Sequence, residues 1–311
     1  MNAPRRPPSR VVDGVLLLDK APGITSNGAL QSARRLYNAQ KAGHTGTLDP
    51  LATGLLPLCF GEATKFAGEL LEADKSYDAV VRLGVTTDTA DAEGQVLETR
   101  PVAVTRGQVE AAVQRFSGEI MQVPPMHSAL KRDGKPLYEY ARAGIEIDRQ
   151  PRRVTIHAIR LLGFDAETLS LSVDCSKGTY IRTLAEDVGR VLGCGAHLAG
   201  LRRTRIGRLS LDHAITLAEL TALTLAERDA RLAPADSLLM DLPAAELGEL
   251  DATRLAHGQP VRWSGPAGGR LRAYGGGRFL GLCLLTPDGY LTPRRLVAEH
   301  GETGGGLAGS A

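Results

Sequence analysis

Residues 43–54 read GHTGTLDPLATG and combine turn-forming residues with two chemically versatile side chains, His44 and Asp49. Asp49 precedes a proline, which disfavours helical backbone there, so we predict an ordered loop over residues 41–54. Two interpretations of this loop stay open. The Asp49 carboxylate either caps nearby backbone amides in a turn, or it is held on a short rigid frame as a nucleophile or base.

A second segment, KGTYIRT at residues 177–183, places Arg182 in the first turn of a helix that we predict over residues 181–192. A cation at that position opposes the helix dipole, which favours anions there. Arg182 therefore either pairs with Glu186 one turn later, or it helps the free helix amides to hold an anion. That anion could be a phosphate or Asp49 itself.

Three more segments carry residues of interest. Tyr77 starts a valine-rich strand in KSYD at residues 75–78 and could be either a core or a functional side chain. Residues 123–132, VPPMHSALKR, form a stiff loop that ends in charge, and residues 202–205, RRTR, form a basic strand edge. An isolated charge run is usually a solvated face, but this one lies soon after the Arg182 helix.

The net charge of +2 conceals strongly segregated charge. Residues 61–100 and 212–251 carry net charges of −5 and −7, whereas residues 126–160 and 252–300 carry +4 and +5. Residues 199–211 add four arginines and no acid. Such segregation provides the basic faces that a polyanion requires.

The pattern of elements predicts an α+β protein of two domains. We expect a strand over 12–18, a helix from Thr25 or Ser26 to Tyr37, a short helix over 63–72, a capping box of Thr105 and Gln108, and paired strands over 154–164 and 169–175. Beyond residue 250, frequent glycine and proline indicate a small β-rich domain. We expect a body over 11–249, this domain over 250–300, and disordered tails at 1–10 and 301–311.

Several classes of protein are disfavoured by the sequence. The four cysteines lack metal-site spacing and are expected to be buried thiols. No phosphate-binding glycine loop follows a predicted strand, so no nucleotide cofactor is expected. No metal-binding motif is present in the sequence, so no metal is expected. No apolar run approaches the ~20 residues of a membrane span. We expect a cytoplasmic protein.

Taken together, these segments resemble the TruB family of bacterial tRNA pseudouridine-55 synthases. The resemblance runs from about Gly14 to Arg208 and rests on GHTGTLDP at 43–50, KSY at 75–77, GTYIR at 178–182 and LRR at 201–203, with weaker matches at 124–131 and 137–139. Two positions depart from the family pattern, namely Ala21 in place of a common proline and His127 in place of a common tyrosine. Neither belongs to the set of catalytic residues.

The resemblance implies a role for each matching residue. Asp49 matches the nucleophilic aspartate, Arg182 its ion-pair partner, and Tyr77 the ring that stacks on the target uracil. Arg182 is expected to lower the pKa of the Asp49 carboxyl by about 1–3 units and so to keep it ionised. His44, Tyr180 and Leu201 match residues that contact the substrate. Weaker expectations fall on four basic residues. Lys20 and Lys131 are expected to give backbone support or to contact RNA, and Arg202 and Arg203 are expected to contact RNA phosphates.

The resemblance also implies a fold and a reaction. The fold would be a mixed, largely antiparallel sheet flanked by helices, with a family-specific extension at about 183–245 and a small PUA-like β-barrel. The reaction would isomerise uridine-55 in the T-loop of tRNA without a cofactor, and a tRNA-folding role would accompany it. The expected partner is the tRNA T-stem-loop, with no membrane and no protein partner, and the protein is expected to be a monomer. The alternatives are a non-catalytic module that binds structured RNA and an aspartate-dependent hydrolase of small molecules.

Overall fold

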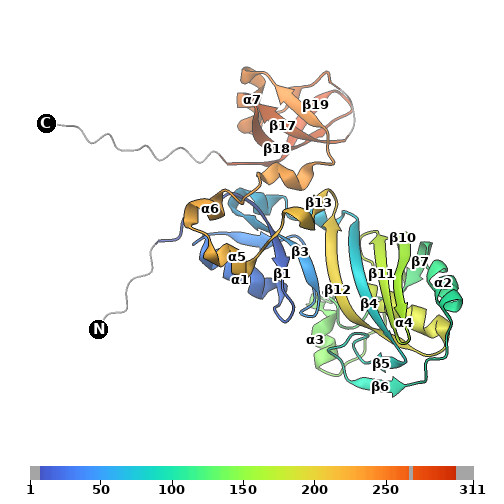
Figure 1. Ribbon diagram of the computed structural model, residues 1–311. Coiled ribbons are helices and arrows are strands. Elements are labelled where there is room, and N and C mark those ends of the chain that lie inside the picture. The colour runs from blue at the N-terminus through green and yellow to red at the C-terminus, as the bar shows by residue number, and fades with distance from the viewer. Residues whose placement is uncertain (1–7, 266–268, 299–311) are drawn as a thin grey trace, which may run out of the picture.

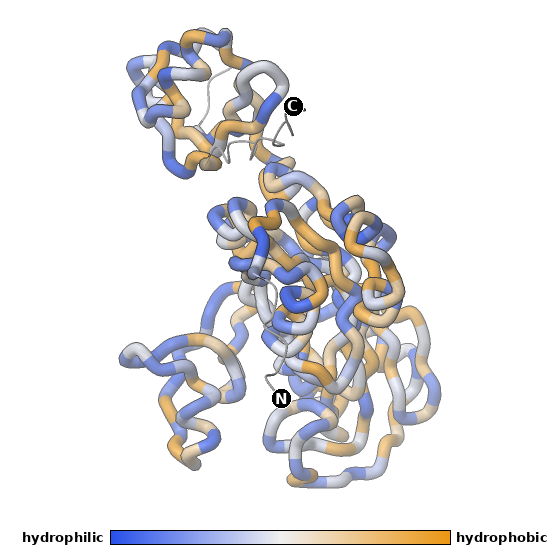
Figure 2. The backbone as a smooth tube through the Cα atoms, turned by 90° about the vertical axis from the view of Figure 1, so that its left-hand side faces the viewer, coloured by the Kyte–Doolittle hydropathy of each residue, from blue (hydrophilic) through white to orange (hydrophobic). Residues whose placement is uncertain are grey.

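The computed structural model describes residues 8–265 and 269–298, which form a large body and a smaller C-terminal domain (Figure 1). Seen from the side, the small domain stands apart from the body as a separate globule (Figure 2). No helix in the described ranges has both the length and the apolar character needed to cross a membrane.

The body is built on one mixed sheet whose main path runs β14-β1-β3-β12-β4-β11-β10-β7, with β2 added to β3 and β13 to β12. Neighbouring strands are antiparallel, except for the parallel pairs β1–β14 and β3–β12. Its strands are β1 (Gly14–Lys20), β2 (Ala42–His44), β3 (Thr53–Phe60), β4 (Lys75–Leu83), β7 (Gly118–Gln122), β10 (Arg152–Asp165), β11 (Thr168–Cys175), β12 (Ala196–Ile206), β13 (Leu209–Ser210) and β14 (Ile215–Thr216).

Helices and short turns cover this sheet. Helices α2 and α4 pack on β4, β10, β11 and β12 through one apolar cluster, while α1 packs on β1 and β3 through another. The helices and 3-10 turns of the body are α1 (Ser26–Leu36), α2 (Arg106–Gln114), α3 (Leu137–Arg142), α4 (Ile181–Leu192), α5 (Leu217–Ala222), α6 (Leu225–Asp229), η1 (Gly61–Lys65), η2 (Glu69–Leu71), η3 (Leu211–His213) and η4 (Ala235–Leu239).

Two small hairpins project from the main sheet. The first pairs β5 (Val85–Thr87) with β6 (Val96–Thr99), and the second pairs β8 (Lys131–Arg132) with β9 (Lys135–Pro136). The second hairpin and α3 belong to an excursion between β7 and β10 that we call the arm, residues 123–151. The arm contains the stiff loop expected from the sequence.

Most elements expected from the sequence are confirmed. The Thr25 hydroxyl caps α1 by accepting from the Gly28 N–H, and Thr105 with Gln108 forms the expected capping box of α2. The single helix expected over 63–72 is wrong, because the segment forms the two separate turns η1 and η2. Gly68, a weak helix former, lies at the break between them.

The C-terminal domain is a five-stranded sheet of order β15-β17-β18-β19-β16 with helix α7 (Glu249–Ala256) packed on it. Its strands are β15 (Ala244–Leu247), β16 (Val261–Arg262), β17 (Arg270–Gly275), β18 (Arg278–Leu285) and β19 (Tyr290–Leu296). The sheet therefore begins before residue 250, where a boundary was expected. The Phe279 ring packs 5.4 Å from the Phe66 ring of the body, centroid to centroid.

The two tails expected to be disordered fall largely outside the described residues, which exclude 1–7 and 299–311. Residues 8–10 are described, and their inclusion in the first tail is wrong. The Arg10 guanidinium pairs with the Asp229 carboxylate, and its backbone bridges to Ala39. The carbonyls of Pro8 and Ser9 accept from the Asn38 and Gln40 side chains, so the N-terminal segment is held to the body from Pro8 onward.

Candidate active site

The glycine- and threonine-rich loop predicted from the sequence forms the turn between β2 and β3, and we call residues 45–52 the Asp49 loop. The side chains of Ser26 and Lys20 hold the backbone of this loop through hydrogen bonds. The Ser26 hydroxyl accepts from the Leu48 N–H at 2.8 Å and donates to the Leu48 carbonyl at 2.9 Å. The Lys20 ammonium, which is fully buried, donates to the carbonyls of Ala21, Ile24 and Pro50. The loop is therefore a fixed frame rather than a mobile connection.

This frame presents the Asp49 carboxylate to Arg182, which lies in the first turn of α4. The Arg182 Nε atom is 3.1 Å from Asp49 Oδ2, and the two side chains are 6% and 38% exposed. The interpretation that Arg182 holds Asp49 is thus supported by direct contact, while no ion pair between Arg182 and Glu186 is present among the described residues. A buried guanidinium therefore orients a carboxylate that is still open to a ligand.

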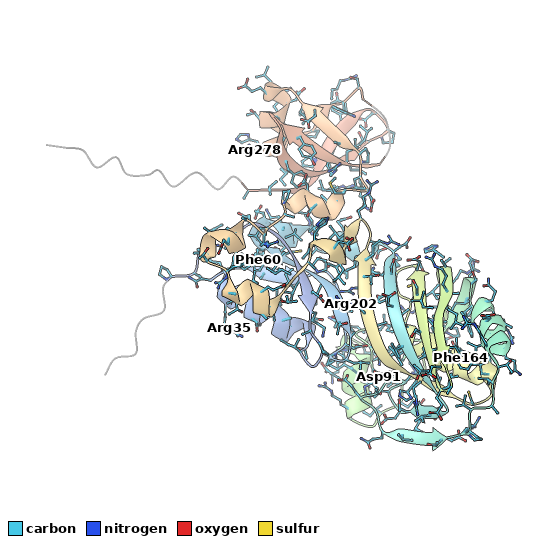
Figure 3. All side chains as sticks on the ribbon, in the orientation of Figure 1. Arg35, Phe60, Asp91, Phe164, Arg202 and Arg278 are labelled. Carbon is cyan, nitrogen blue, oxygen red and sulfur yellow. The ribbon has the colours of Figure 1, made fainter. Side chains whose placement is uncertain are left out.

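Arg182 has a second carboxylate partner, Asp91, which the sequence reasoning missed. The Arg182 Nη1 atom is 3.5 Å from Asp91 Oδ2, and the Thr89 hydroxyl donates to Asp91 Oδ1 at 2.6 Å. Asp91 is 3% exposed and lies near the lower end of the central sheet in Figure 3. The guanidinium also donates hydrogen bonds to the backbone carbonyls of Thr89 and His127. Arg182 is therefore held rigidly from four directions.

The electrostatics of Asp49 differ from the simple expectation of a pKa lowered by Arg182. Burial raises the pKa of the Asp49 carboxyl above its usual 3.8, and the negative charge of Asp91 raises it further. Arg182 lowers the pKa of Asp49 but does not outweigh these effects. The expected net lowering is wrong, because desolvation dominates when a carboxylate sits this deep.

Two of the three apolar or aromatic side chains expected at the site, Tyr77 and Tyr180, lie close enough to Asp49 for its charge to act on their phenols. Tyr77 and Leu201 lie at the edge of the apolar cluster beneath α4, and both are partly exposed. Tyr180 is fixed by Gln122, whose side-chain oxygen accepts from the Tyr180 N–H at 3.1 Å.

His44 ends β2 at the entrance to the Asp49 loop. Burial lowers the pKa of its imidazole, and the Arg203 charge adds to this lowering. The ring is therefore neutral at neutral pH. Its Nδ1 atom is buried without a hydrogen-bond partner among the described residues.

The four basic residues with weaker expectations behave differently from one another. Lys131 is exposed on the arm hairpin, and Lys20 supports the loop backbone. Arg202, marked in Figure 3, forms a forked ion pair with Asp19 at 2.7 and 3.1 Å. Arg203 is only 2% exposed, so the expected contact with RNA phosphates does not fit its position. Successive side chains on a strand point to opposite faces of the sheet, which is why Arg202 and Arg203 have different surroundings.

The cysteines take no part in this site as nucleophiles. All four thiols are free and buried, as expected. Cys175 lies close to Lys75, yet burial raises its pKa to about 12. A thiol with that pKa is protonated at neutral pH and is a poor nucleophile.

Three family models match the chain in succession. They are described as the TruB family pseudouridylate synthase N-terminal domain (residues 34–181), the tRNA pseudouridylate synthase B C-terminal domain (182–240) and the pseudouridine synthase II TruB C-terminal domain (243–297). Two similar proteins are both called tRNA pseudouridine synthase B. The one from Aromatoleum aromaticum is 59% identical over 289 residues, covering 93% of this chain and 94% of its own. The one from Ralstonia nicotianae is 61% identical over 300 residues, with 93% and 96% covered.

Solved structures with a similar fold agree with these matches. A chain from an H/ACA RNP bound to a substrate RNA superposes with a TM-score of 0.70 at 24% identity, covering 92% of this chain and 85% of its own. A chain from a Cbf5-Nop10-Gar1 complex gives 0.69 at 27% identity, with 88% and 78% covered. The expected architecture is confirmed: a mixed, mostly antiparallel sheet flanked by helices, and a curled C-terminal sheet consistent with a PUA-like domain.

Proposed function

Because the chain belongs to the TruB family of pseudouridine synthases, we propose that it converts uridine-55 in the T-loop of tRNA into pseudouridine, with Asp49 as the nucleophile. The observation that carries this assignment is the Asp49–Arg182 ion pair, in which a buried guanidinium orients a partly exposed carboxylate at 3.1 Å. The relatives named as tRNA pseudouridine synthases support the substrate. The activity is an intramolecular isomerisation.

The target base must leave its stack before it can reach Asp49. Base flipping costs a few kcal/mol, and stacking on one aromatic ring recovers about 1–3 kcal/mol. We assign that ring to Tyr77, and the remaining walls of the pocket to Tyr180, which interacts with Asp49, and to Leu201, which packs on the same apolar cluster as Tyr77. His44, neutral and partly exposed, is assigned to the T-loop that the base has vacated.

The reaction then needs one carboxylate and no external group. The bond between N1 of uracil and C1′ of the sugar breaks, and its electrons stay with the detached base. The base turns over, C5 forms the new bond to C1′, and the C5 proton is lost while N1 regains one. Asp49 either attacks the sugar or assists an elimination, and in both routes it must be ionised. Arg182 keeps the carboxylate oriented throughout.

The rest of the chain is assigned to RNA binding. The net charge of +5 over residues 252–300 supports an RNA-binding role for the C-terminal domain, and Lys131 on the exposed arm is assigned to the tRNA backbone. All the residues assigned to the site come from a single chain, which supports a monomer. A tRNA substrate supports a cytoplasmic location.

The decisive experiment maps pseudouridine at each position of a tRNA transcript incubated with the wild type or with Asp49→Asn. We expect pseudouridine at position 55 with the wild type and none with Asp49→Asn, although that variant should fold and bind tRNA normally. A non-catalytic RNA-binding module would give no product with either protein. Product from Asp49→Asn would exclude the nucleophile assignment.

A further inference from the structure

Arg203 contacts the Asp49 loop and stands opposite Tyr77, yet its side chain is buried. On β12 it stands opposite Tyr77 of β4 and opposite Gly54 of β3. Its Nε atom donates to the Leu55 carbonyl at 2.8 Å, and its Nη2 atom donates to the Gly46 carbonyl at 3.4 Å. The guanidinium also lies close enough to the Tyr77 phenol for the two groups to interact electrostatically. One side chain thus connects the Asp49 loop, strand β3 and the stacking ring.

The backbone of Arg203 is fixed as firmly as its side chain. A side-chain carbon at Gly54 would lie 2.3 Å from the Arg203 carbonyl oxygen, so only glycine allows β12 to approach β3 this closely. The Gly54 φ of +96° also favours glycine. This close approach of β12 to β3 fixes the position of the Arg203 side chain relative to Tyr77.

The position of Arg203 is energetically expensive. No carboxylate in the described part of the chain forms an ion pair with it, and its hydrogen bonds go to neutral oxygens. Burying a charge without a counterion is strongly unfavourable unless its donors are well satisfied. The guanidinium keeps its two carbonyl acceptors and its place beside the Tyr77 phenol only if the Asp49 loop and Tyr77 adopt the arrangement seen here. The buried charge therefore penalises other arrangements of these two elements.

We propose that Arg203 is a positioning residue for the isomerisation, which fixes the Tyr77 ring relative to the Asp49 loop, and that it does not contact RNA. This inference rests on the proposed function. Tyr77 remains the residue that touches the base, and Arg203 acts through its phenol and through the Gly46 carbonyl. A misplacement of about 1 Å can cost 100-fold in rate, so loss of this connection should appear in turnover rather than in binding.

The test compares Arg203→Met and Arg203→Lys with the wild type in single-turnover pseudouridine formation on a tRNA transcript. We expect Arg203→Met to slow the reaction about 100-fold, while the Kd for tRNA and its salt dependence stay unchanged. Arg203→Lys keeps the positive charge but not the planar guanidinium, so its rate should lie between the rates of the wild type and of Arg203→Met. Arg82→Met serves as the matched control, because Arg82 lies on the same strand as Tyr77 but pairs with Glu167 at the surface.

A double-mutant cycle separates positioning from a purely structural role. If Arg203 acts through the phenol, Arg203→Lys should cost less in a Tyr77→Phe background than in the wild type. This comparison stands even if Arg203→Met fails to fold. Equal losses in both backgrounds, or a rate loss that only follows the lost folded fraction, would overturn the proposal.

Two further results would have distinct meanings. Weaker tRNA binding with a smaller salt dependence and unchanged turnover would make Arg203 an RNA contact, against the proposal. No product from the wild type would refute the proposed function itself. Wild-type product together with unaffected Arg203 variants would refute only the positioning role.

Discussion

Ser26 offers the sharpest test of how the fold holds Asp49. Its hydroxyl makes two hydrogen bonds to the backbone of Leu48, and Leu48 is 4% exposed, so water cannot easily replace them. Ser26→Ala leaves one buried N–H and one buried carbonyl without this partner. Each such group costs about 1–3 kcal/mol, so we expect a loss of about 2–6 kcal/mol in the free energy of unfolding. That corresponds to a fall in Tm of roughly 4–24 °C.

The same change should affect catalysis, because Leu48 directly precedes Asp49. At a temperature where the variant is folded, we expect turnover to fall about 10–100-fold with little change in KM. Thermal unfolding and single-turnover pseudouridine formation measure the two effects. Ser32→Ala, on the same helix but partly exposed, should change stability by less than about 0.5 kcal/mol. A Ser26→Ala variant with the Tm and turnover of the wild type would refute the reasoning.

Three other perturbations have defined outcomes. Asp49 must be ionised for the reaction and its pKa is raised, so turnover in a pH–rate profile should fall on the acid side, through a pKa above 3.8. Asp91→Asn removes a charge that raises the pKa of Asp49, so in this variant the fall in turnover should occur at lower pH. Gly54→Ala should push β12 away at Arg203 and abolish turnover, with a lowered Tm in calorimetry. Phe279→Ala should weaken the contact between the C-terminal domain and the body, which limited proteolysis would reveal as faster cleavage between them.

Much of the fold and the chemical centre could be predicted from the sequence, because both depend on short-range signals. The Thr25 cap, the capping box of α2 and the helix over residues 181–192 are local patterns, and each is confirmed. The pairing of Asp49 with Arg182 was one of two open alternatives for Arg182. Only the fold, which brings the start of α4 to the β2–β3 turn, decides between them.

What could not be predicted depends on contacts distant in sequence or on the side of a strand. Asp91 lies in an acidic, polar segment that reads as a surface turn, and its burial follows from a bridge to Leu198 far along the chain. Arg203 was read as part of a basic run together with Arg202. Neighbouring residues on a strand point to opposite faces, so a basic run on a strand need not be one basic surface.

The shared arginine explains how the site can hold a carboxylate firmly without making it inert. Arg182 faces Asp49 at 3.1 Å and Asp91 at 3.5 Å, so two carboxylates share one guanidinium. A nearby arginine lowers the pKa of a carboxyl and weakens it as a nucleophile. At Asp49, burial has the larger effect and raises the pKa of the carboxyl, and the charge of Asp91 raises it further. The carboxylate thus keeps the orientation that the ion pair provides and also a higher basicity, which favours attack on the sugar or assistance to an elimination.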